Sequence, residues 1–299
     1  MNKIFKKVTL FVAMIMAVCA ISVVTSTEAK AATITLKQTG ATETSISISW
    51  TPVAGAYYYK VYMGGVTAQT QYTGGTMTGL QTGRKYYTYV TAYNASGYSI
   101  GSSESVYCVT KPKVGKIWLD EWKQGTTTPK IKWQNENYTY PDGYEVCLMN
   151  AKGKTVKTIT AGSDAYYKFV LPGGSTVKNK GFSIKVRAFY NTTGGRIYGD
   201  WSAEQRFAPM PKMKFSSGSK TLSWAKIPGA KSYSVYRRTL SGSYKKYKTV
   251  KSTSVVINQP TYSTYRYYVV ANGLKVHGKK INSTAPESIY VMSIYCGRR

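Results

Sequence analysis

Three stretches of the chain repeat one pattern of apolar and polar positions. Each opens with an alternating strand that ends in Trp, continues with a Tyr-x-Val strand and then reaches a Val-x-Ala strand. The landmarks are Ile46, Ile48, Trp50, Tyr59, Val61, Val90 and Ala92; then Ile131, Trp133, Tyr144, Val146, Val186 and Ala188; then Leu222, Trp224, Tyr233, Val235, Val269 and Ala271. Alternation with a period of two predicts strands that bury one face. The repeat predicts a chain of similar units.

The residues between these landmarks also favour β structure. Tyr, Thr, Val and Ile dominate the runs, while Gly, Asn, Ser and Pro interrupt them, as is typical of short strands joined by tight turns. Copies of about 80–100 residues fit antiparallel two-sheet sandwiches. Prolines at 112, 209 and 211 separate the copies. We place the domains at residues 32–111, 112–210 and 211–299.

The first 31 residues have the composition of a secretory signal peptide. Three lysines lie within the first seven residues, an almost wholly apolar run covers residues 8–24, and Ala29-Lys30-Ala31 forms a small-x-small cleavage site. The alternative is an uncleaved membrane anchor, for which the run is short. No later run is long enough to span a bilayer, so we expect no transmembrane segment in the mature chain. The sequence therefore predicts a secreted or extracellular protein.

One region of the first copy resembles the fibronectin type III family. The segment from Leu80 to Gly97 reads Leu-x-x-Gly-x-x-Tyr-x-x-x-Val-x-Ala-x-Asn-x-x-Gly, which is the family's signature apart from Thr82 at a proline position. The segments that begin at Trp50 and Trp224, where Gly-Ala leads into Tyr-x-Val-Tyr, are similar to members of this family in secreted bacterial proteins.

The resemblance implies an all-β chain of three tandem immunoglobulin-like (fibronectin type III) β-sandwiches. It also implies that Tyr86 is a corner tyrosine whose hydroxyl bonds to the backbone. Tyr265 occupies this position in the third copy and Phe182 in the second, which diverges from the family. Such domains are binding, spacer or adhesion modules, and the fold itself carries no activity.

Residues that could carry catalysis are sparse. His277, the only histidine, has no acid close to it in the sequence, so we expect a solvated loop residue and not a catalytic base. Asp120-Glu121 is the only adjacent acidic pair, and a surface turn does not hold two carboxylates across a cleft. No catalytic, phosphate-binding or dinucleotide motif is present. We expect no enzyme activity, no cofactor and no metal site.

Three cysteines follow residue 31, and one falls in each copy. Cys108, Cys147 and Cys296 lack the close spacing of a zinc or redox site. Two interpretations stay open: three unpaired thiols, or an intermolecular bridge through Cys296.

Positive charge increases from copy to copy. Residues 32–111 hold 5 basic and 2 acidic residues, residues 112–210 hold 15 and 8, and residues 211–299 hold 17 and 1. Basic residues interleaved with tyrosine can bind polyanions, whereas lysine-rich surfaces can also simply keep a protein soluble. The predicted polyanion-binding residues are Arg237, Arg238, Lys245, Lys246, Lys248, Lys279 and Lys280.

The first copy is rich in tyrosine. Alternation that buries Tyr59 and Val61 places Tyr58 and Tyr62 on the opposite face of the strand. We interpret these two residues as an aromatic contact surface for carbohydrate or protein. The alternative is cross-strand tyrosine pairs that stabilise an exposed sheet.

Together these features predict a non-enzymatic extracellular or cell-surface binding or adhesion protein, with cell-wall association as one location. Its expected partner is an anionic cell-wall polymer or another extracellular polyanion, such as a glycosaminoglycan or nucleic acid. The alternative is a spacer or accessory protein of a wall- or polysaccharide-degrading system.

Overall fold

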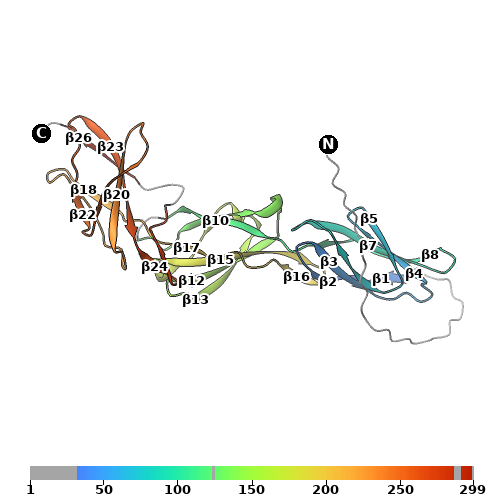
Figure 1. The fold of residues 1–299 in the computed structure, drawn as a ribbon. Coiled ribbons are helices and arrows are strands. Elements are labelled where there is room, and N and C mark those ends of the chain that lie inside the picture. Colours follow the sequence, from blue (N-terminus) through green and yellow to red (C-terminus); the bar gives the residue numbers. More distant parts are fainter. Residues whose placement is uncertain (1–31, 123–124, 286–290, 298–299) are drawn as a thin grey trace. The chain divides into compact units, whose positions relative to one another are not determined.

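The structure is a computed structural model, and it describes residues 32–122, 125–285 and 291–297 (Figure 1). The signal peptide predicted for residues 1–31 lies outside this range. Strands make up most of the fold, with three short 3-10 helices, Glu136–Tyr138, Ser163–Tyr166 and Gly174–Thr176. No helix in the described ranges is of a length and apolarity that would let it cross a bilayer.

The chain packs into two compact units. Unit 1 contains the described residues up to Val114, with Asn135–Gly143 and Arg187–Asp200; unit 2 contains Gly115–Gln134, Tyr144–Val186 and the described residues from Trp201 onward. The predicted domain limits at residues 111 and 210 stay predictions.

The first sandwich lies in unit 1 and has two sheets. One runs β1 (Ala32–Ile34), β8 (Ser99–Ser103), β7 (Lys85–Tyr93), β4 (Tyr58–Met63) and β5 (Val66–Thr70), with β9 (Val106–Val109) also paired to β7. The other is β2 (Leu36–Ala41), β3 (Ser45–Trp50) and β6 (Gly74–Thr78). Every second residue of β3 and β4 is buried, which confirms the predicted alternation. Trp50 meets Tyr59 edge-on, with ring centroids 5.6 Å apart.

The predicted tyrosine corner is confirmed in this sandwich. The backbone N–H of Gln81 donates to the hydroxyl oxygen of Tyr86 over 2.7 Å. Because the hydroxyl spans the turn that leads into β7, it holds the loop against the strand. Tyr265, at the same position of the third copy, makes no such bond to any described residue and instead lies beside Arg237.

Strands of the second copy form two further sheets. One runs β10 (Val114–Glu121), β11 (Lys130–Asn135) and β14 (Phe169–Val170); the other runs β13 (Thr155–Gly162), β12 (Gly143–Asn150), β15 (Phe182–Thr192) and β16 (Gly195–Tyr198), with β17 (Gln205–Phe207) paired to β15. In unit 2 the core joins Trp133 to Tyr144 at 5.0 Å and Trp122 to Phe182 at 5.1 Å. Phe182 is fully buried, so the missing corner hydroxyl is replaced by an aromatic core contact.

The third sandwich belongs to unit 2. Its sheets are β18 (Met213–Ser216), β19 (Thr221–Trp224) and β22 (Ser254–Val256), and then β21 (Lys245–Val250), β20 (Ser232–Thr239), β23 (Ser263–Asn272) and β26 (Met292–Cys296); β24 (Leu274–Val276) and β25 (Lys279–Ile281) form a separate hairpin. The Tyr233 hydroxyl accepts a bond of 2.9 Å from the Ile227 N–H, as the Tyr59 hydroxyl does from Val53 at 3.0 Å in the first sandwich. The tyrosine of the repeated Tyr-x-Val motif therefore accepts an equivalent backbone hydrogen bond in both sandwiches.

Candidate functional site

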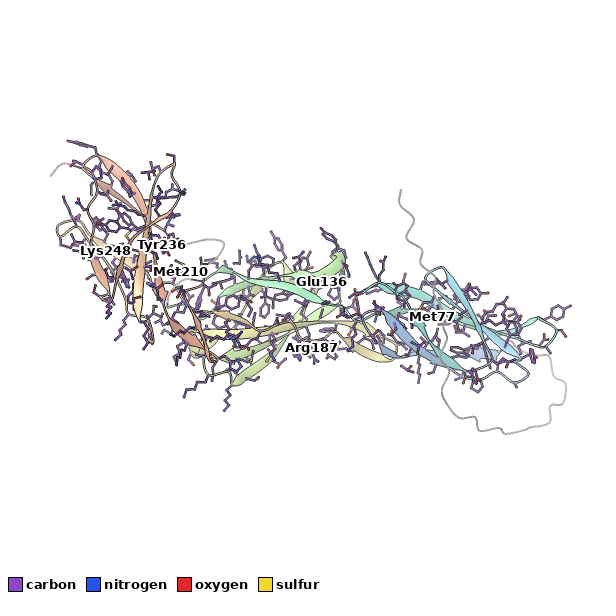
Figure 2. The ribbon with its side chains drawn as sticks, in the orientation of Figure 1. Met77, Glu136, Arg187, Met210, Tyr236 and Lys248 are labelled. Atoms are coloured by element: carbon purple, nitrogen blue, oxygen red, sulfur yellow. The ribbon has the colours of Figure 1, made fainter. Side chains whose placement is uncertain are left out.

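The four-stranded sheet β21-β20-β23-β26 brings together most of the predicted polyanion-binding residues. β20 pairs with β21 so that Tyr236 lies opposite Lys246 and Arg237 opposite Lys245. Lys245, Lys246 and Lys248 are all exposed; Figure 2 labels Tyr236 and Lys248. Since β21 is an edge strand, its lysine side chains are free to meet a ligand from the side of the sheet.

Arg237 differs from this group in its place on the sheet, and its predicted contact with a polyanion stays a prediction. It follows the buried Val235 by two positions on β20, so it lies on the core side of the sheet. Its guanidinium carbon lies 4.2 Å from the ring centroid of Tyr247, and its Nη1 donates to the Asn258 carbonyl over 2.8 Å. These two contacts connect Arg237 of β20 to Tyr247 of β21 and to the Asn258 carbonyl.

Arg238 lies on the outer face of the same sheet. Its guanidinium carbon is 4.9 Å from the Tyr244 ring centroid, and Nη1 has a long contact of 3.4 Å to the Gly242 carbonyl. Its Nε is buried and has no hydrogen-bond partner in the described part of the chain. Directly opposite, on β23, lies Arg266. Sequence reasoning missed Arg266 because it is a single basic residue between two tyrosines, and only the strand register places it beside Arg238.

Lys279 and Lys280 do not join this cluster. They lie on the β24–β25 hairpin, where Val276 faces Lys279 and Lys275 faces Lys280. Both are exposed, and the hairpin forms its own two-stranded sheet. The predicted set therefore divides into a sheet cluster and a hairpin pair.

Stacked tyrosines border the arginines on the outer face of the sheet. Tyr236 and Tyr268 are parallel, with ring centroids 4.8 Å apart and an interplanar angle of 8°. Tyr244 meets Tyr268 edge-on at 4.7 Å. Burial raises the pKa of Tyr268, and the neighbouring Tyr236 and Tyr244 add to the effect. The Tyr268 phenol is therefore a neutral hydrogen-bonding group at physiological pH.

The first sandwich carries matching tyrosine pairs. Tyr58 stacks on Tyr93 at 5.0 Å, and Tyr62 stacks on Tyr89 at 4.4 Å, each across β4 and β7. The cross-strand pairing that was the alternative for Tyr58 and Tyr62 is therefore present, and both are half-buried. A contact role for the same face stays a prediction.

His277 has an acidic partner that the sequence did not reveal. Its Nδ1 lies 2.9 Å from Oε1 of Glu204, which also pairs with Arg206 at 2.7 Å. Burial opposes ionisation of Glu204, but neighbours that include His277 and Arg206 outweigh it and lower the pKa of this carboxyl. The pair holds the turn between β24 and β25, where the His277 N–H also donates to the Ala151 carbonyl over 2.7 Å.

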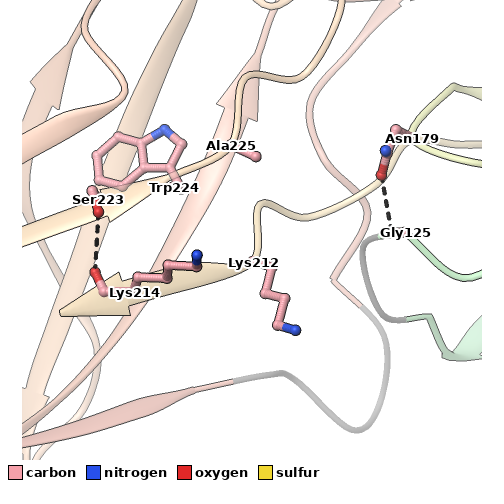
Figure 3. A pocket seen from close by; sticks show the side chains of 7 residues that line it. All are labelled: Gly125, Asn179, Lys212, Lys214, Ser223, Trp224 and Ala225. Carbon is pink, nitrogen blue, oxygen red and sulfur yellow. Dashed lines mark hydrogen bonds between the residues drawn. The ribbon is translucent and has the colours of Figure 1, made fainter.

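A cavity of about 440 Å³ opens in unit 2 (Figure 3). Its polar lining includes Asn179, Lys212, Lys214 and Ser223, beside the ring of Trp224. The Gly125 N–H donates to the Asn179 side chain over 2.9 Å. This lining offers amines, an amide and a hydroxyl but no carboxylate, thiol or imidazole. Among the described residues, no group of three or more acidic, His or Cys side chains is arranged to hold a metal ion.

Comparison with known proteins identifies the family of the first domain. The model of the Fibronectin type III domain matches residues 31–109. No curated protein matches the chain. Among solved structures, the FN1–FN3 domains of chicken CNTN1 are 13% identical, with 88% of this chain and 97% of that chain covered and a TM-score of 0.27. A two-domain fibronectin type III segment of chicken tenascin is 17% identical, with 58% and 97% covered and a TM-score of 0.32.

The architecture agrees with this match. The first and third sandwiches share the Trp–Tyr core contact and the same tyrosine hydroxyl bond. Fibronectin type III domains are typical of extracellular binding, adhesion or spacer proteins and are generally not catalytic. The chain is thus all-β, built from tandem fibronectin type III-like β-sandwiches, with the family signature itself in residues 31–109.

Proposed function

We propose that the protein is a non-enzymatic extracellular binding or adhesion protein that attaches to a polyanion through its third domain. The observation that carries this proposal is charge asymmetry: residues 211–299 contain 17 basic residues and a single acid, Glu287. A surface with so little opposing charge attracts polyanions over several ångströms and raises their local concentration. The first domain, with 5 basic and 2 acidic residues, has no comparable excess.

The position of the lysines also admits a structural explanation. Lysines on an edge strand prevent one sheet from pairing with another, and Lys245, Lys246 and Lys248 lie on the edge strand β21. This does not account for Arg266, which lies on the interior strand β23. Positive charge that extends inward from the edge supports a ligand-binding role for the sheet.

If the predicted signal peptide directs export, the protein meets its polyanion outside the cell. Anionic cell-wall polymers, glycosaminoglycans and extracellular nucleic acid all carry the required charge. A protein exported in this way would attach by its cationic domain, while the tyrosine face of the first domain, with Tyr58 and Tyr62, would be available for carbohydrate or protein.

The test is a salt-dependent retention series with residues 32–299. The chain is applied to cell walls, heparin and DNA, and the salt needed for elution is measured. We expect elution above physiological ionic strength, about 0.15 M. A site that contacts several anionic groups at once needs more salt for release than a single contact does. Replacement of Lys245, Lys246 and Lys248 by Gln should shift elution to lower salt.

A matched control removes the same charge elsewhere. Lys152, Lys154 and Lys157 are exposed in the second copy, and their replacement by Gln should change elution less than the β21 variant does. Equal loss in both variants would show that net charge alone is responsible. Elution of the unmodified chain at or below physiological salt from every matrix would overturn the proposal and favour a spacer role.

A further inference from the structure

Arg238 and Arg266 form a like-charge pair across two neighbouring strands. They are direct partners in the register of β20 and β23, two positions from the stacked pair Tyr236 and Tyr268. Directly opposite side chains on one face have Cβ atoms about 4.5–5.5 Å apart, and like charges at that spacing repel. Such a pair is destabilising, and an anion between the two guanidinium groups would offset the repulsion.

The described part of the third domain supplies no such anion. The only acid in residues 211–299 is Glu287, which lies outside the described range. Arg266 is half-buried, and its side chain makes no hydrogen bond or ion pair with any residue that the structure describes. Arg238 makes one long contact to the Gly242 carbonyl and has a buried, unpartnered Nε. Two guanidinium groups therefore have unused donors on one face.

The first sandwich provides an internal comparison. Tyr62 and Tyr89 stack there as Tyr236 and Tyr268 do in the third. At the positions that correspond to the two arginines, however, the first sandwich has Gly64, just after the end of β4, and Tyr87 of β7, and the Gly64 N–H donates to the Tyr87 carbonyl over 3.0 Å. The aromatic pair is thus a shared structural feature, whereas the arginine pair is particular to the third domain.

We propose that Arg238 and Arg266 bind a sulfate or phosphate ester group carried on an anionic polysaccharide. The inference rests on the proposed polyanion attachment and names its ligand class. Guanidinium groups match tetrahedral oxyanions with paired, charge-assisted hydrogen bonds. The adjacent phenol hydroxyls can bond to sugar hydroxyls.

The arrangement of the rings disfavours nucleobases as the occupant. Tyr236 and Tyr268 each cover one face of the other, and Tyr244 and Tyr268 meet in an edge-to-face contact. Arg238 lies over the ring of Tyr244. Proteins that hold single strands without sequence preference stack bases on open aromatic faces, whereas each ring of this cluster has one face covered by a neighbour. Binding of a polysaccharide requires only the guanidinium groups, which donate hydrogen bonds to the ester oxyanion, and the tyrosine hydroxyls, which bond to the sugar.

The experiment measures binding of residues 32–299 to dextrans of equal length and equal substitution. Dextran sulfate and dextran phosphate carry ester oxyanions and distinguish the two sources of that chemistry. Carboxymethyl dextran matches the single charge of each sulfate group with a carboxylate, whereas each phosphate group carries about −1.5 to −2 at pH 7. We expect Arg266→Gln to weaken binding of the preferred ester dextran ~10-fold, which corresponds to the loss of one strong charge-assisted contact. Arg266→Lys should weaken it nearly as much, because an ammonium retains the charge but loses the planar fork.

The control variant is Lys226→Gln, which removes one exposed positive charge from the same domain. We expect it to change affinity less than ~2-fold. Equal affinity for carboxymethyl dextran, unchanged binding in Arg266→Lys, or equal losses in Lys226→Gln and Arg266→Gln would overturn the site. Tighter, Arg266-dependent binding of single-stranded DNA would overturn the choice of a polysaccharide.

A second measurement guards against a folding defect. Relief of the arginine repulsion should leave the unliganded Arg266→Gln variant at least as stable to heat as the unmodified chain. The ester dextran should raise the melting temperature of the unmodified chain more than that of the variant. If the β21 lysine variant loses binding while Arg266→Gln does not, the proposed function stands and the site fails. If the unmodified chain binds no polyanion above physiological salt, both fail.

Discussion

The Nδ1 atom of His277 lies 2.9 Å from a carboxylate oxygen of Glu204, although 73 residues separate the two in the chain. The contact anchors the β24–β25 turn, where His277 has a φ of 45°. The ring also packs against Gly153, where any Cβ would lie only 2.2 Å from the imidazole. The turn is thus held by side-chain and backbone contacts together.

This pair predicts a pH-dependent stability. The pKa of Glu204 is lowered in the folded chain, so its carboxylate contributes stability above the unfolded pKa, about 4.3. That contribution is lost as the pH falls through the folded value. Glu204→Gln should lower stability at pH 7 by ~1 kcal/mol, and its difference from the unmodified chain should shrink below about pH 4. Urea unfolding between pH 3 and 7 measures this, with Asp164→Asn, at an exposed position of the 3-10 helix Ser163–Tyr166, as the control variant.

The tyrosine corner predicts a specific loss in the first sandwich. Tyr86→Phe removes the acceptor for the Gln81 N–H and should destabilise this domain by about 0.5–1.5 kcal/mol. Tyr87→Phe is the matched control, because its ring is 53% exposed on the opposite face of β7. Denaturant unfolding compares the two. If the two variants lose the same free energy of unfolding, the hydrogen bond of the tyrosine corner does not stabilise the domain.

Two kinds of basic residue in the third domain should have different effects when they are replaced: one kind should affect folding stability and the other should affect polyanion binding. Arg237→Gln removes the contacts to Tyr247 and the Asn258 carbonyl and should cost ~1 kcal/mol of folding free energy. Lys248→Gln should leave stability within about 0.5 kcal/mol and reduce retention on the polyanion matrices. Thermal unfolding and elution salt measure the two effects. Destabilisation by Lys248→Gln that matches Arg237→Gln would contradict this division.

The cysteines should differ in reactivity. Burial raises the pKa of the Cys108 thiol, and this side chain is fully buried, so its reactive thiolate is scarce and shielded. Cys147 and Cys296 are half-buried. Iodoacetamide at pH 8 should label these two in the folded chain and Cys108 only after unfolding, as mass spectrometry of peptides would show. Folded-state labelling of Cys108 at the rate of Cys147 would contradict the prediction. A dimer that is lost on reduction would instead support the intermolecular bridge through Cys296.

Sequence reasoning reached the core and the fold class but only part of the candidate site. Trp50, Tyr59 and Val61 were recognisable because a buried strand face must recur at every second residue. Tyr86 was recognisable because its family signature places a hydroxyl next to a fixed turn. Arg237 and Arg238 point to opposite faces of the sheet because they are adjacent on one strand, and only the tertiary structure places Arg237 beside Tyr247.

The sequence by itself determined the β-sandwich repeats and the increase of charge toward the carboxyl end, since both follow from local periodicity and composition. Tertiary structure decided which side chains meet. The pairing of Arg238 with Arg266 follows from the register of two strands, and the contact of His277 with Glu204 follows from how a turn packs within unit 2. Neither relationship leaves a local pattern, because both depend on contacts between segments that are far apart in the chain.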